Sequence, residues 1–169
     1  MNDNTHNAVI GIDPGKDGAV ARYGADGDLY IELTPTVKVT KREYDVADMR
    51  RLLNSLAGHA TFAFLEKQQA WHGQGVTSMF SIGQGYGLWE GLLVGLGIPY
   101  QVVRPQTWQR EMLRDVQGKG KARAILAATR MFPDTDFRRT PKCKGPHDGK
   151  CDAAMIAVYG HRYLLGQAK

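Results

Sequence analysis

Two short apolar segments of this chain each end in a carboxylate. The run at residues 8–12 (Ala-Val-Ile-Gly-Ile) leads directly into Asp13, and the run at residues 62–65 (Phe-Ala-Phe-Leu) leads into Glu66. Apolar runs this short, bounded by turn or polar residues, are typical of buried β-strands. The sequence therefore predicts two core strands, residues 8–13 and 61–66, whose last residues are acidic.

The remaining segments predict how these two strands are connected. Residues 18–23 and 28–33 alternate between apolar and polar and are joined by a Gly- and Asp-rich turn, so with 8–13 they form an antiparallel meander. Helical spacing or helix-start signals follow at 45–57, 76–96, 105–112, 119–131 and 149–165, with a short strand at 99–103. This order predicts an α/β fold: a mixed five-stranded sheet, first antiparallel and then parallel, flanked by helices. The parallel pairing places Asp13 beside Glu66.

Two further segments are unusual in composition. The predicted helix 76–96 contains five glycines, at positions 83, 85, 87, 91 and 95. Glycine in a helix costs ~1 kcal/mol relative to alanine, so this pattern indicates close backbone packing against the sheet or a second subunit. Residues 133–147 are rich in Pro, Asp, Arg and Lys and are predicted to form a mobile loop.

Length and charge restrict the class of protein. The 169 residues are expected to form one domain, 1–169. Lys and Arg outnumber Asp and Glu by 22 to 17, a net charge of +5, which favours polyanionic partners and nucleic acid first. No apolar run approaches the ~20 residues of a membrane span, and residues 1–7 lack a signal core, so a cytoplasmic protein without a membrane partner is expected. Two cysteines are too few for a secreted disulfide framework.

A second pair of carboxylates opens the last predicted helix. Asp148 and Asp152 are four positions apart and so lie on one helix face. Carboxylates that are brought together repel one another unless a cation neutralises them, and carboxylate oxygens suit a hard divalent cation such as Mg²⁺. Acidic metal ligands inside a basic protein indicate phosphodiester cleavage. Taken singly, each acid has a simpler interpretation, because Asp13 precedes a Pro-Gly turn and Asp148 is a good helix N-cap.

A zinc site is the competing interpretation of the same region. Cys143, His147 and Cys151 lie near one another in the sequence, but a closed structural zinc site requires four ligands. Asp148 is the only fourth candidate, and the metal-dependent nuclease site already uses it. A role for His147 near the scissile phosphate is favoured instead.

These motifs, in this order, resemble those of RuvC-like Holliday junction resolvases. Residues 11–15 (Gly-Ile-Asp-Pro-Gly), 64–67 (Phe-Leu-Glu-Lys) and 148–153 (Asp-Gly-Lys-Cys-Asp-Ala) are similar to the family's three acidic motifs. The likeness also includes the glycine-containing helix at 82–87 and the segments at 105–108 and 119–122, and it extends from about residue 8 to about residue 165. It implies a ribonuclease H-like fold, a homodimer, Mg²⁺ or Mn²⁺, and paired symmetric nicks in four-way DNA junctions.

One spacing departs from the bacterial pattern. Bacterial members of the family separate the last two acids by three positions, whereas Asp148 and Asp152 are four apart. This spacing, with Gln-Gly-Tyr-Gly-Leu-Trp at 84–89, is more similar to the phage and plastid branches. The resemblance therefore assigns Asp152 more directly than Asp148.

The chemistry expected at such a site uses two metal ions ~3.5–4 Å apart. Asp13, on the central strand, is expected to bridge both ions. Glu66 is expected to hold the ion on the leaving-group side, and Asp152 with Asp148 the ion on the nucleophile side. Hydrolysis would leave a 5′ phosphate, and no small-molecule cofactor is expected.

Several residues outside the acidic set are predicted to contact DNA, although solvated surfaces or packing also explain them. Basic residues at the start of a helix suit phosphate contact, and the resemblance places Lys121 beside the cleaved phosphate. The polar loop after Glu66 offers Trp71 to stack on an unpaired base, or alternatively to pack in the core or a dimer contact. The full set comprises Lys119, Lys121, Arg123, Gln68, Trp71, Lys142 and Lys144, with Arg138 and Arg139 in the same basic loop.

Other functions share parts of this pattern. A ribonuclease acting on RNA–DNA hybrids or a nuclease acting on other branched DNA would use the same carboxylates, and a catalytically silent junction-binding module would keep only the basic surface. Residues 11–18 also resemble the phosphate hairpin of actin-like ATPases, but those proteins need two such domains and ~350 residues. A Holliday junction resolvase is therefore the leading prediction.

Overall fold

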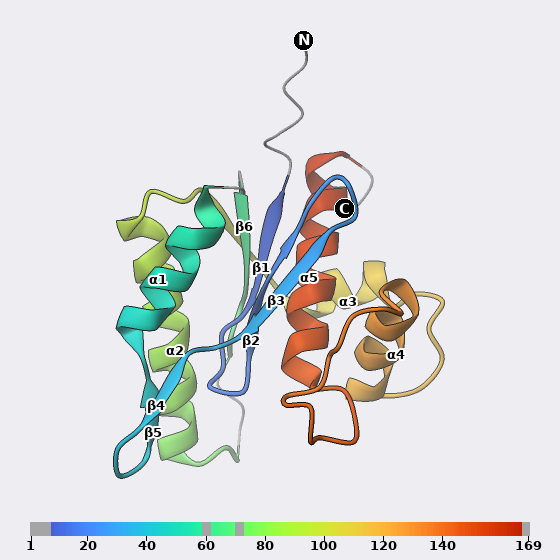
Figure 1. Cartoon of the computed structure of the whole chain (residues 1–169). Coiled ribbons are helices and arrows are strands. Elements are labelled where there is room, and N and C mark those ends of the chain that lie inside the picture. The colour runs from blue at the N-terminus through green and yellow to red at the C-terminus, as the bar shows by residue number, and fades with distance from the viewer. Residues whose placement is uncertain (1–7, 59–61, 70–72, 167–169) are drawn as a thin grey trace.

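A single five-stranded sheet forms the centre of the molecule, with helices on both faces (Figure 1). The computed structural model describes residues 8–58, 62–69 and 73–166. The strands of the sheet are β1 (Val9–Asp13), β2 (Ala19–Tyr23), β3 (Leu29–Leu33), β6 (Phe62–Glu66) and β7 (Tyr100–Val103). The helices are α1 (Val46–Ala57), α2 (Val76–Gly95), α3 (Pro105–Met112), α4 (Lys121–Met131) and α5 (Asp148–Leu164).

The pairing of the strands confirms the predicted mixed sheet. Their order is β3-β2-β1-β6-β7; β1, β2 and β3 pair antiparallel, whereas β1–β6 and β6–β7 pair parallel. Ile12 is opposite Leu65 in the β1–β6 register. Asp13 and Glu66 therefore end neighbouring strands at the same edge of the sheet.

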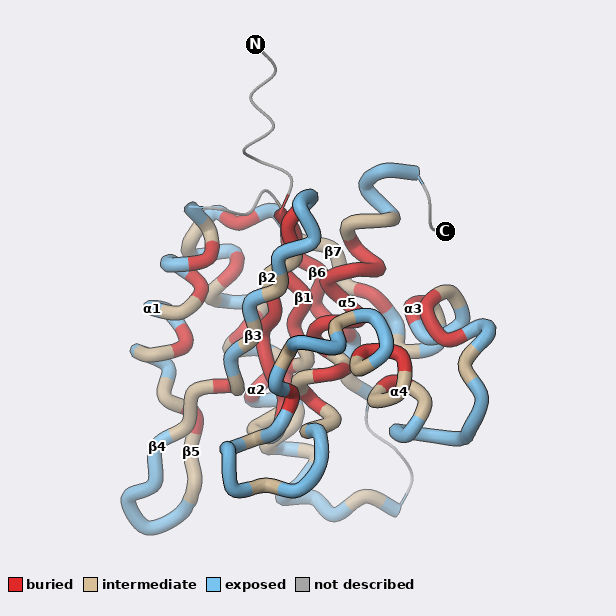
Figure 2. Tube along the Cα trace, turned by 45° about the vertical axis from the view of Figure 1, so that its right-hand side comes forward, coloured by how far each residue is buried: buried red, intermediate tan, exposed pale blue. Residues whose placement is uncertain are grey.

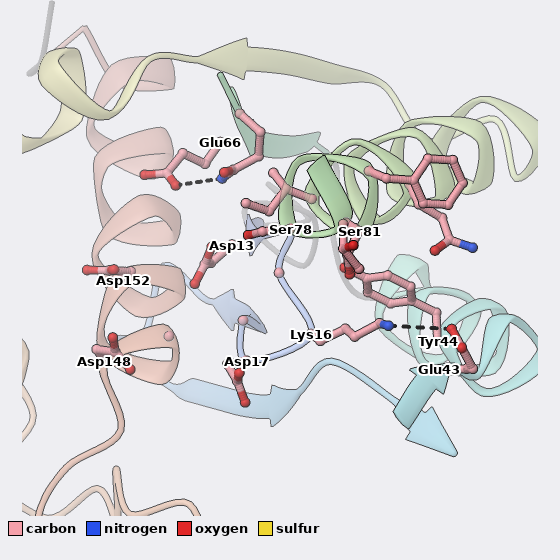
Figure 3. Close-up of a pocket in the computed structure, with 18 of the residues that line it drawn as sticks. Asp13, Lys16, Asp17, Glu43, Tyr44, Glu66, Ser78, Ser81, Asp148 and Asp152 are labelled. Atoms are coloured by element: carbon pink, nitrogen blue, oxygen red, sulfur yellow. Dashed lines mark hydrogen bonds and ion pairs between the residues drawn. The ribbon is translucent and has the colours of Figure 1, made fainter. Parts of the chain in front are cut away.

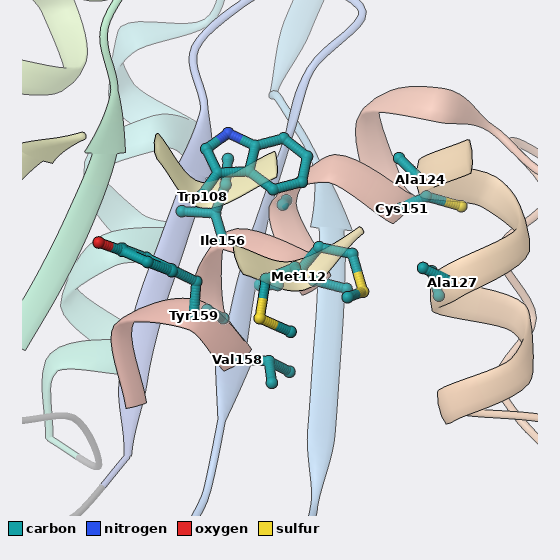
Figure 4. Packing of buried hydrophobic residues seen from close by; sticks show 14 of the residues in the cluster. Trp108, Met112, Ala124, Ala127, Cys151, Ile156, Val158 and Tyr159 are labelled. Carbon is teal, nitrogen blue, oxygen red and sulfur yellow. The ribbon is translucent and has the colours of Figure 1, made fainter. Parts of the chain in front are cut away.

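The two faces of the sheet are covered by different helices. Helices α1 and α2 cover one face, and α5 with α3 and α4 covers the other (Figure 1). Ile10 and Ile12 belong to the core cluster on the α1–α2 side, whereas Val9 and Phe64 belong to the cluster on the α5 side, where Figure 4 shows the packing. This alternation along the strands is the two-residue period of a sheet that is buried on both faces.

Helix α5 packs unusually close to the sheet and is buried over most of its length (Figure 2). A Cβ added to Gly11 of β1 would lie only 2.3 Å from the backbone nitrogen of Ala157. Only glycine permits this approach, because real Cβ atoms do not come so near to backbone. The contact fixes the position of α5, and with it the acidic first turns of that helix.

A small hairpin beside the sheet is absent from the sequence-based prediction. Strands β4 (Thr36–Lys38) and β5 (Arg42–Tyr44) form a separate two-stranded sheet between β3 and α1. Strands of three residues are too short to show a reliable alternation, and charged residues occupy half of their positions. The periodicity of the sequence therefore gives no signal for them.

The loop at 133–147, predicted to be mobile, closes on itself instead. An isolated β-bridge pairs Arg138 with Pro146, and the backbone N–H of His147 donates to the carbonyl of Phe137 at 2.8 Å. Phe137 is 3% exposed and joins the core on the α5 side. Phe137 thus anchors the loop to the core, although the other residues of the loop are mostly polar or charged.

The glycines of α2 fulfil the packing prediction only in part. Gly85 is buried, and a Cβ there would lie 2.2 Å from the hydroxyl of Tyr44 and 2.6 Å from the carbonyl of Pro14. The other four glycines of the helix meet nothing within 4 Å among the residues that the structure describes. Within the same residues, no helix has both the length and the apolar character to span a membrane.

Candidate active site

One open pocket of about 1010 Å³ contains all four predicted carboxylates (Figure 3). Asp13 and Glu66 reach it from the ends of β1 and β6, and Asp148 and Asp152 reach it from the first two turns of α5. The opposite wall consists of the hairpin and the start of α2. Its lining residues include Lys41, Glu43, Tyr44, Ser78 and Ser81.

A second glycine lets α5 begin at the floor of this pocket. A Cβ on Gly149 would lie 2.2 Å from the carbonyl oxygen of Asp17 and 3.1 Å from Asp13 Oδ2. With hydrogen alone at this position, the first turn of α5 rests directly on the turn between β1 and β2. The carboxylates of the helix and of the strand consequently share one small volume.

Three of the four acids, Asp13, Glu66 and Asp152, hold their protons more tightly than free carboxyl groups. Removal from water raises the pKa of Asp13 well above its usual value, and the charges of Glu66, Asp152 and Asp148 raise it further. Desolvation first, and then the charges of Glu66 and Asp148, raise the pKa of Asp152 to about 7. Desolvation also raises the pKa of Glu66. Like charges that destabilise one another in this way are neutralised by protons or by a bound cation.

Lys121 already supplies one positive charge at this site. Its ammonium forms a hydrogen-bonded ion pair with Asp148 Oδ2. Desolvation works against ionisation of Asp148, but the contact with Lys121, the backbone N–H of Gly149 and the charge of His147 together lower the pKa of Asp148. Of the four acids, Asp148 is the one whose pKa lies below its usual value.

The oxygen donors of this pocket are of the type that binds a hard divalent cation, although their side chains are not arranged around one common point. In the part of the chain that the structure describes, no three His, Cys, Asp or Glu side chains are arranged to hold a common ion. Four carboxylates on one pocket, most of them with raised pKa values, are nevertheless the oxygen donors that Mg²⁺ and Mn²⁺ prefer. Residues 13, 66, 148 and 152 are thus the candidate ligands.

Glu66 is held by two hydrogen bonds that its sequence motif does not predict. The indole N–H of Trp108, on α3, donates to Glu66 Oε1 at 2.8 Å, and the side-chain amide of Gln68 donates to Glu66 Oε2 at 3.1 Å (the latter drawn in Figure 3). Trp108 is fully buried and Glu66 is 8% exposed. Both bonds stabilise the charged carboxylate and oppose the upward shift of its pKa. The contact of Gln68 with DNA stays a prediction.

The predicted DNA-binding residues fall into three groups. Lys119, Lys142 and Lys144 are exposed, and Lys121 lines the pocket. Arg123 instead donates to the backbone carbonyls of residues 113 and 116, which ties α4 to the end of α3. Trp71 lies outside the described residues. DNA contact by any of them stays a prediction.

An ion cluster at the rim of the pocket was not predicted. Asp17 accepts hydrogen bonds from Arg139 and Arg42, each at 2.6 Å, and these bonds lower its pKa to about 2. Arg139 belongs to the loop at 133–147 and Arg42 to the hairpin. Asp17 therefore links three surface segments that are far apart in the sequence.

Comparison with known proteins identifies structural neighbours only. No protein-family model and no curated protein sequence matches the chain. The structure is similar to Thermus thermophilus RuvC, with a TM-score of 0.60 and 18% identity over 96% of this chain and 98% of that one. The structure of T. thermophilus RuvC in complex with Holliday junction substrate has a TM-score of 0.60 and 16% sequence identity, over 96% of this chain and 98% of that one. The yeast mitochondrial Holliday junction resolvase Ydc2 has a TM-score of 0.63 and 14% sequence identity, over 96% of this chain and 80% of that one. The chain thus has the ribonuclease H-like fold of these solved resolvases.

Proposed function

We propose that this protein is a metal-dependent endonuclease that resolves Holliday junctions by paired symmetric nicks in four-way DNA. The observation that carries the proposal is the pocket that Asp13, Glu66 and Asp152, all with raised pKa values, line together in a basic chain. Its fold is shared with solved resolvases, one of them in complex with a Holliday junction. Carboxyl groups with strongly perturbed pKa values in a cleft are typical of catalytic sites.

Each side chain has a role that its position supports. Asp13 and Glu66 present carboxylates from the rigid sheet edge, and Asp148 and Asp152 present theirs from a buried helix. Mg²⁺ or Mn²⁺ bound there would supply an activated water and stabilise the leaving 3′ oxygen, so that a 5′ phosphate remains. Lys121 lies on the same wall and offers its ammonium to the phosphate that is cut.

We also propose that the protein acts as a homodimer through the exposed face of α2. Val76, Phe80 and Val94 of this helix are 78%, 72% and 64% exposed, and Glu90 is its only charged residue. The glycines on the same face allow a second backbone to approach closely. A two-fold dimer would give the two active sites that paired nicks on opposed strands require.

Cleavage of defined substrates tests the main proposal. The purified protein is incubated with a mobile four-way junction, an RNA–DNA hybrid and a linear duplex, in Mg²⁺ and in EDTA. The expected result is symmetric nicking of the junction alone in Mg²⁺, loss of nicking in Asp13→Asn, and full activity in Asp115→Asn, which changes an exposed acid outside the pocket. Degradation of the hybrid without junction cutting would support a ribonuclease instead. Junction binding without any cleavage would leave only a binding module.

Sedimentation tests the dimer separately. Val94→Asp places a charge on the apolar face, outside the pocket, and is expected to convert a dimer to monomers and to uncouple the two nicks. Leu164→Asp, at an exposed apolar residue of α5, is the matched control and is expected to sediment as the wild type does. A monomeric wild-type protein that still makes paired nicks would contradict this assignment.

A further inference from the structure

The hairpin β4–β5 projects away from the central sheet and is not part of it (Figure 1). Its residues Lys41, Glu43 and Tyr44 line the pocket that contains the carboxylates. The two strands of the hairpin pair Lys38 with Arg42, and residues 39–41 form the tip. The tip is strongly exposed: Val39 is 86% exposed and the side chain of Lys41 83%.

The base of the hairpin is fixed by contacts to two other elements. Arg42 donates to Thr36 Oγ1 at 3.1 Å and to Asp17 Oδ1 at 2.6 Å, which joins the hairpin to the turn after β1. The hydroxyl of Tyr44 donates to the carbonyl of Ser81 at 3.1 Å, which joins it to α2. The base of the hairpin is thus held in place, whereas its tip at residues 39–41 is exposed to solvent.

The charges at the base are neutralised, but those toward the tip are not. Arg42 is paired with Asp17, and Lys16 with Glu43 at 3.4 Å. Lys38, in contrast, forms no ion pair with any residue that the structure describes. Lys41 pairs with Glu43 at 3.2 Å, but both side chains are solvated, and such a pair is readily exchanged for another anion. The hairpin therefore presents two available cations beside an acidic pocket.

The pocket itself indicates which anion these cations meet. Figure 3 shows the acids of α5 on one side and residues 43 and 44 of the hairpin on the other, with Asp13 and Asp17 between them. Lys121 lies on the α5 side, where it pairs with Asp148. A polyanion that crosses the pocket would meet Lys121 on one wall and the hairpin lysines on the other. A nucleic acid strand, with its row of phosphates, is a polyanion long enough to reach both.

We propose that Lys38 and Lys41 bind the phosphate backbone of the duplex DNA that leads into the pocket, so that the hairpin forms the second wall of the DNA-binding groove. The inference rests on the proposed nuclease function, and it adds a contact surface that none of the acidic or basic sequence motifs includes. Lysine contacts of this kind position the DNA without reading its sequence.

Salt-dependent binding tests the proposal. Affinity of Lys38→Gln/Lys41→Gln for a linear duplex and a four-way junction is measured by fluorescence anisotropy in EDTA, from about 50 to about 200 mM salt. Loss of two phosphate contacts is expected to reduce the slope of log K against log salt by about 1.8 for duplex DNA and to raise Kd roughly tenfold or more. The Lys38→Arg/Lys41→Arg variant keeps both charges and is expected to bind as the wild type does.

A second pair of substitutions controls for net charge. Arg130→Gln/Arg162→Gln removes the same charge at the last turns of α4 and α5, at the end of the molecule where Tyr23 packs against Phe132 and His161. This variant is expected to keep the wild-type slope. An unchanged slope in the hairpin variant, or an equal loss in both variants, would overturn the proposal.

The same proteins separate this inference from the proposed function. Cleavage of the junction by the wild-type protein in Mg²⁺ decides whether the protein is a resolvase, whereas the slope in EDTA decides whether the hairpin binds DNA. If the wild type binds DNA but cuts nothing, the resolvase proposal fails and the comparison of slopes still decides the role of the hairpin. Unchanged thermal unfolding of the double variant is expected, because both side chains are exposed.

Discussion

Replacing Trp108 with Phe should slow cleavage without weakening DNA binding. Trp108 is fully buried, and its indole N–H donates to Glu66 Oε1 at 2.8 Å. Phe keeps an aromatic ring in the core but has no donor, so Glu66 retains only the hydrogen bond from Gln68. The carboxylate can then rotate away from the pocket.

The expected size of the effect follows from the type of bond that is lost. A hydrogen bond to a charged group contributes about 1.5–3 kcal/mol. If that bond holds Glu66 in the orientation that catalysis needs, its loss slows the chemical step by about 10-fold to about 150-fold. The bond also opposes the desolvation that raises the pKa of Glu66. Its removal should therefore move the acidic limb of the pH–rate profile to higher pH.

Trp89→Phe is the matched control for this experiment. Trp89 is also fully buried, but it lies in the core cluster on the α1–α2 side, and its indole nitrogen has no hydrogen-bond partner among the described residues. Both variants lose the same atoms from a core, so both should lose some stability in urea unfolding. Only Trp108→Phe should lower the single-turnover cleavage rate at saturating protein, and the Kd for the junction in EDTA should not change in either. Equal slowing in the two variants would refute the positioning role of Trp108.

Three further predictions concern the acids, the close packing of α5 and the lysine at the pocket. Because desolvation and neighbouring carboxylates raise the pKa of Asp152 to about 7, its ionisation removes stability as the pH rises from about 4 to about 7 in EDTA. The gain in melting temperature of Asp152→Asn over wild type should grow across that window and shrink in Mg²⁺. Gly11→Ala should lower the free energy of unfolding by at least about 2 kcal/mol in urea titration, whereas Gly145→Ala, with nothing within 4 Å, should not. Lys121→Gln should slow single-turnover cleavage at least about tenfold, whereas Lys119→Gln should change only the salt dependence of binding.

The adjacency of Asp13 and Glu66 could be predicted from the sequence because it depends on strand order alone. Apolar runs identify the two strands, and parallel pairing brings their last residues to the same edge. The position of α5 depends on more than periodicity. Its approach to β1 requires glycine at residue 11 opposite Ala153 and Ala157, and a long-range match of this kind has no local signature.

Contacts that depend on helix rotation could not be predicted. Trp108 and Glu66 are 42 positions apart, and their hydrogen bond requires α3 to turn one particular face toward the end of β6. The pair of Lys121 with Asp148 likewise depends on how α4 packs against α5. The hairpin was missed for a different reason, since its short strands are held by Arg42 and Tyr44 rather than by an apolar pattern.

The structure also gives a physical reason for the four-residue spacing of the last two acids. Each residue advances an α-helix by about 100° around its axis. Viewed down the axis, a residue three positions before Asp152 therefore lies to one side of Asp152 and a residue four positions before it lies to the other side, about 100° apart. The position three before Asp152 is Gly149, where a Cβ would lie 2.2 Å from the carbonyl of Asp17. An acidic side chain at residue 149 does not fit while α5 rests on that turn. At residue 148 the carboxylate has room, and it meets Lys121. The close seating of α5 on the turn after β1 therefore determines which residue can provide the fourth acid.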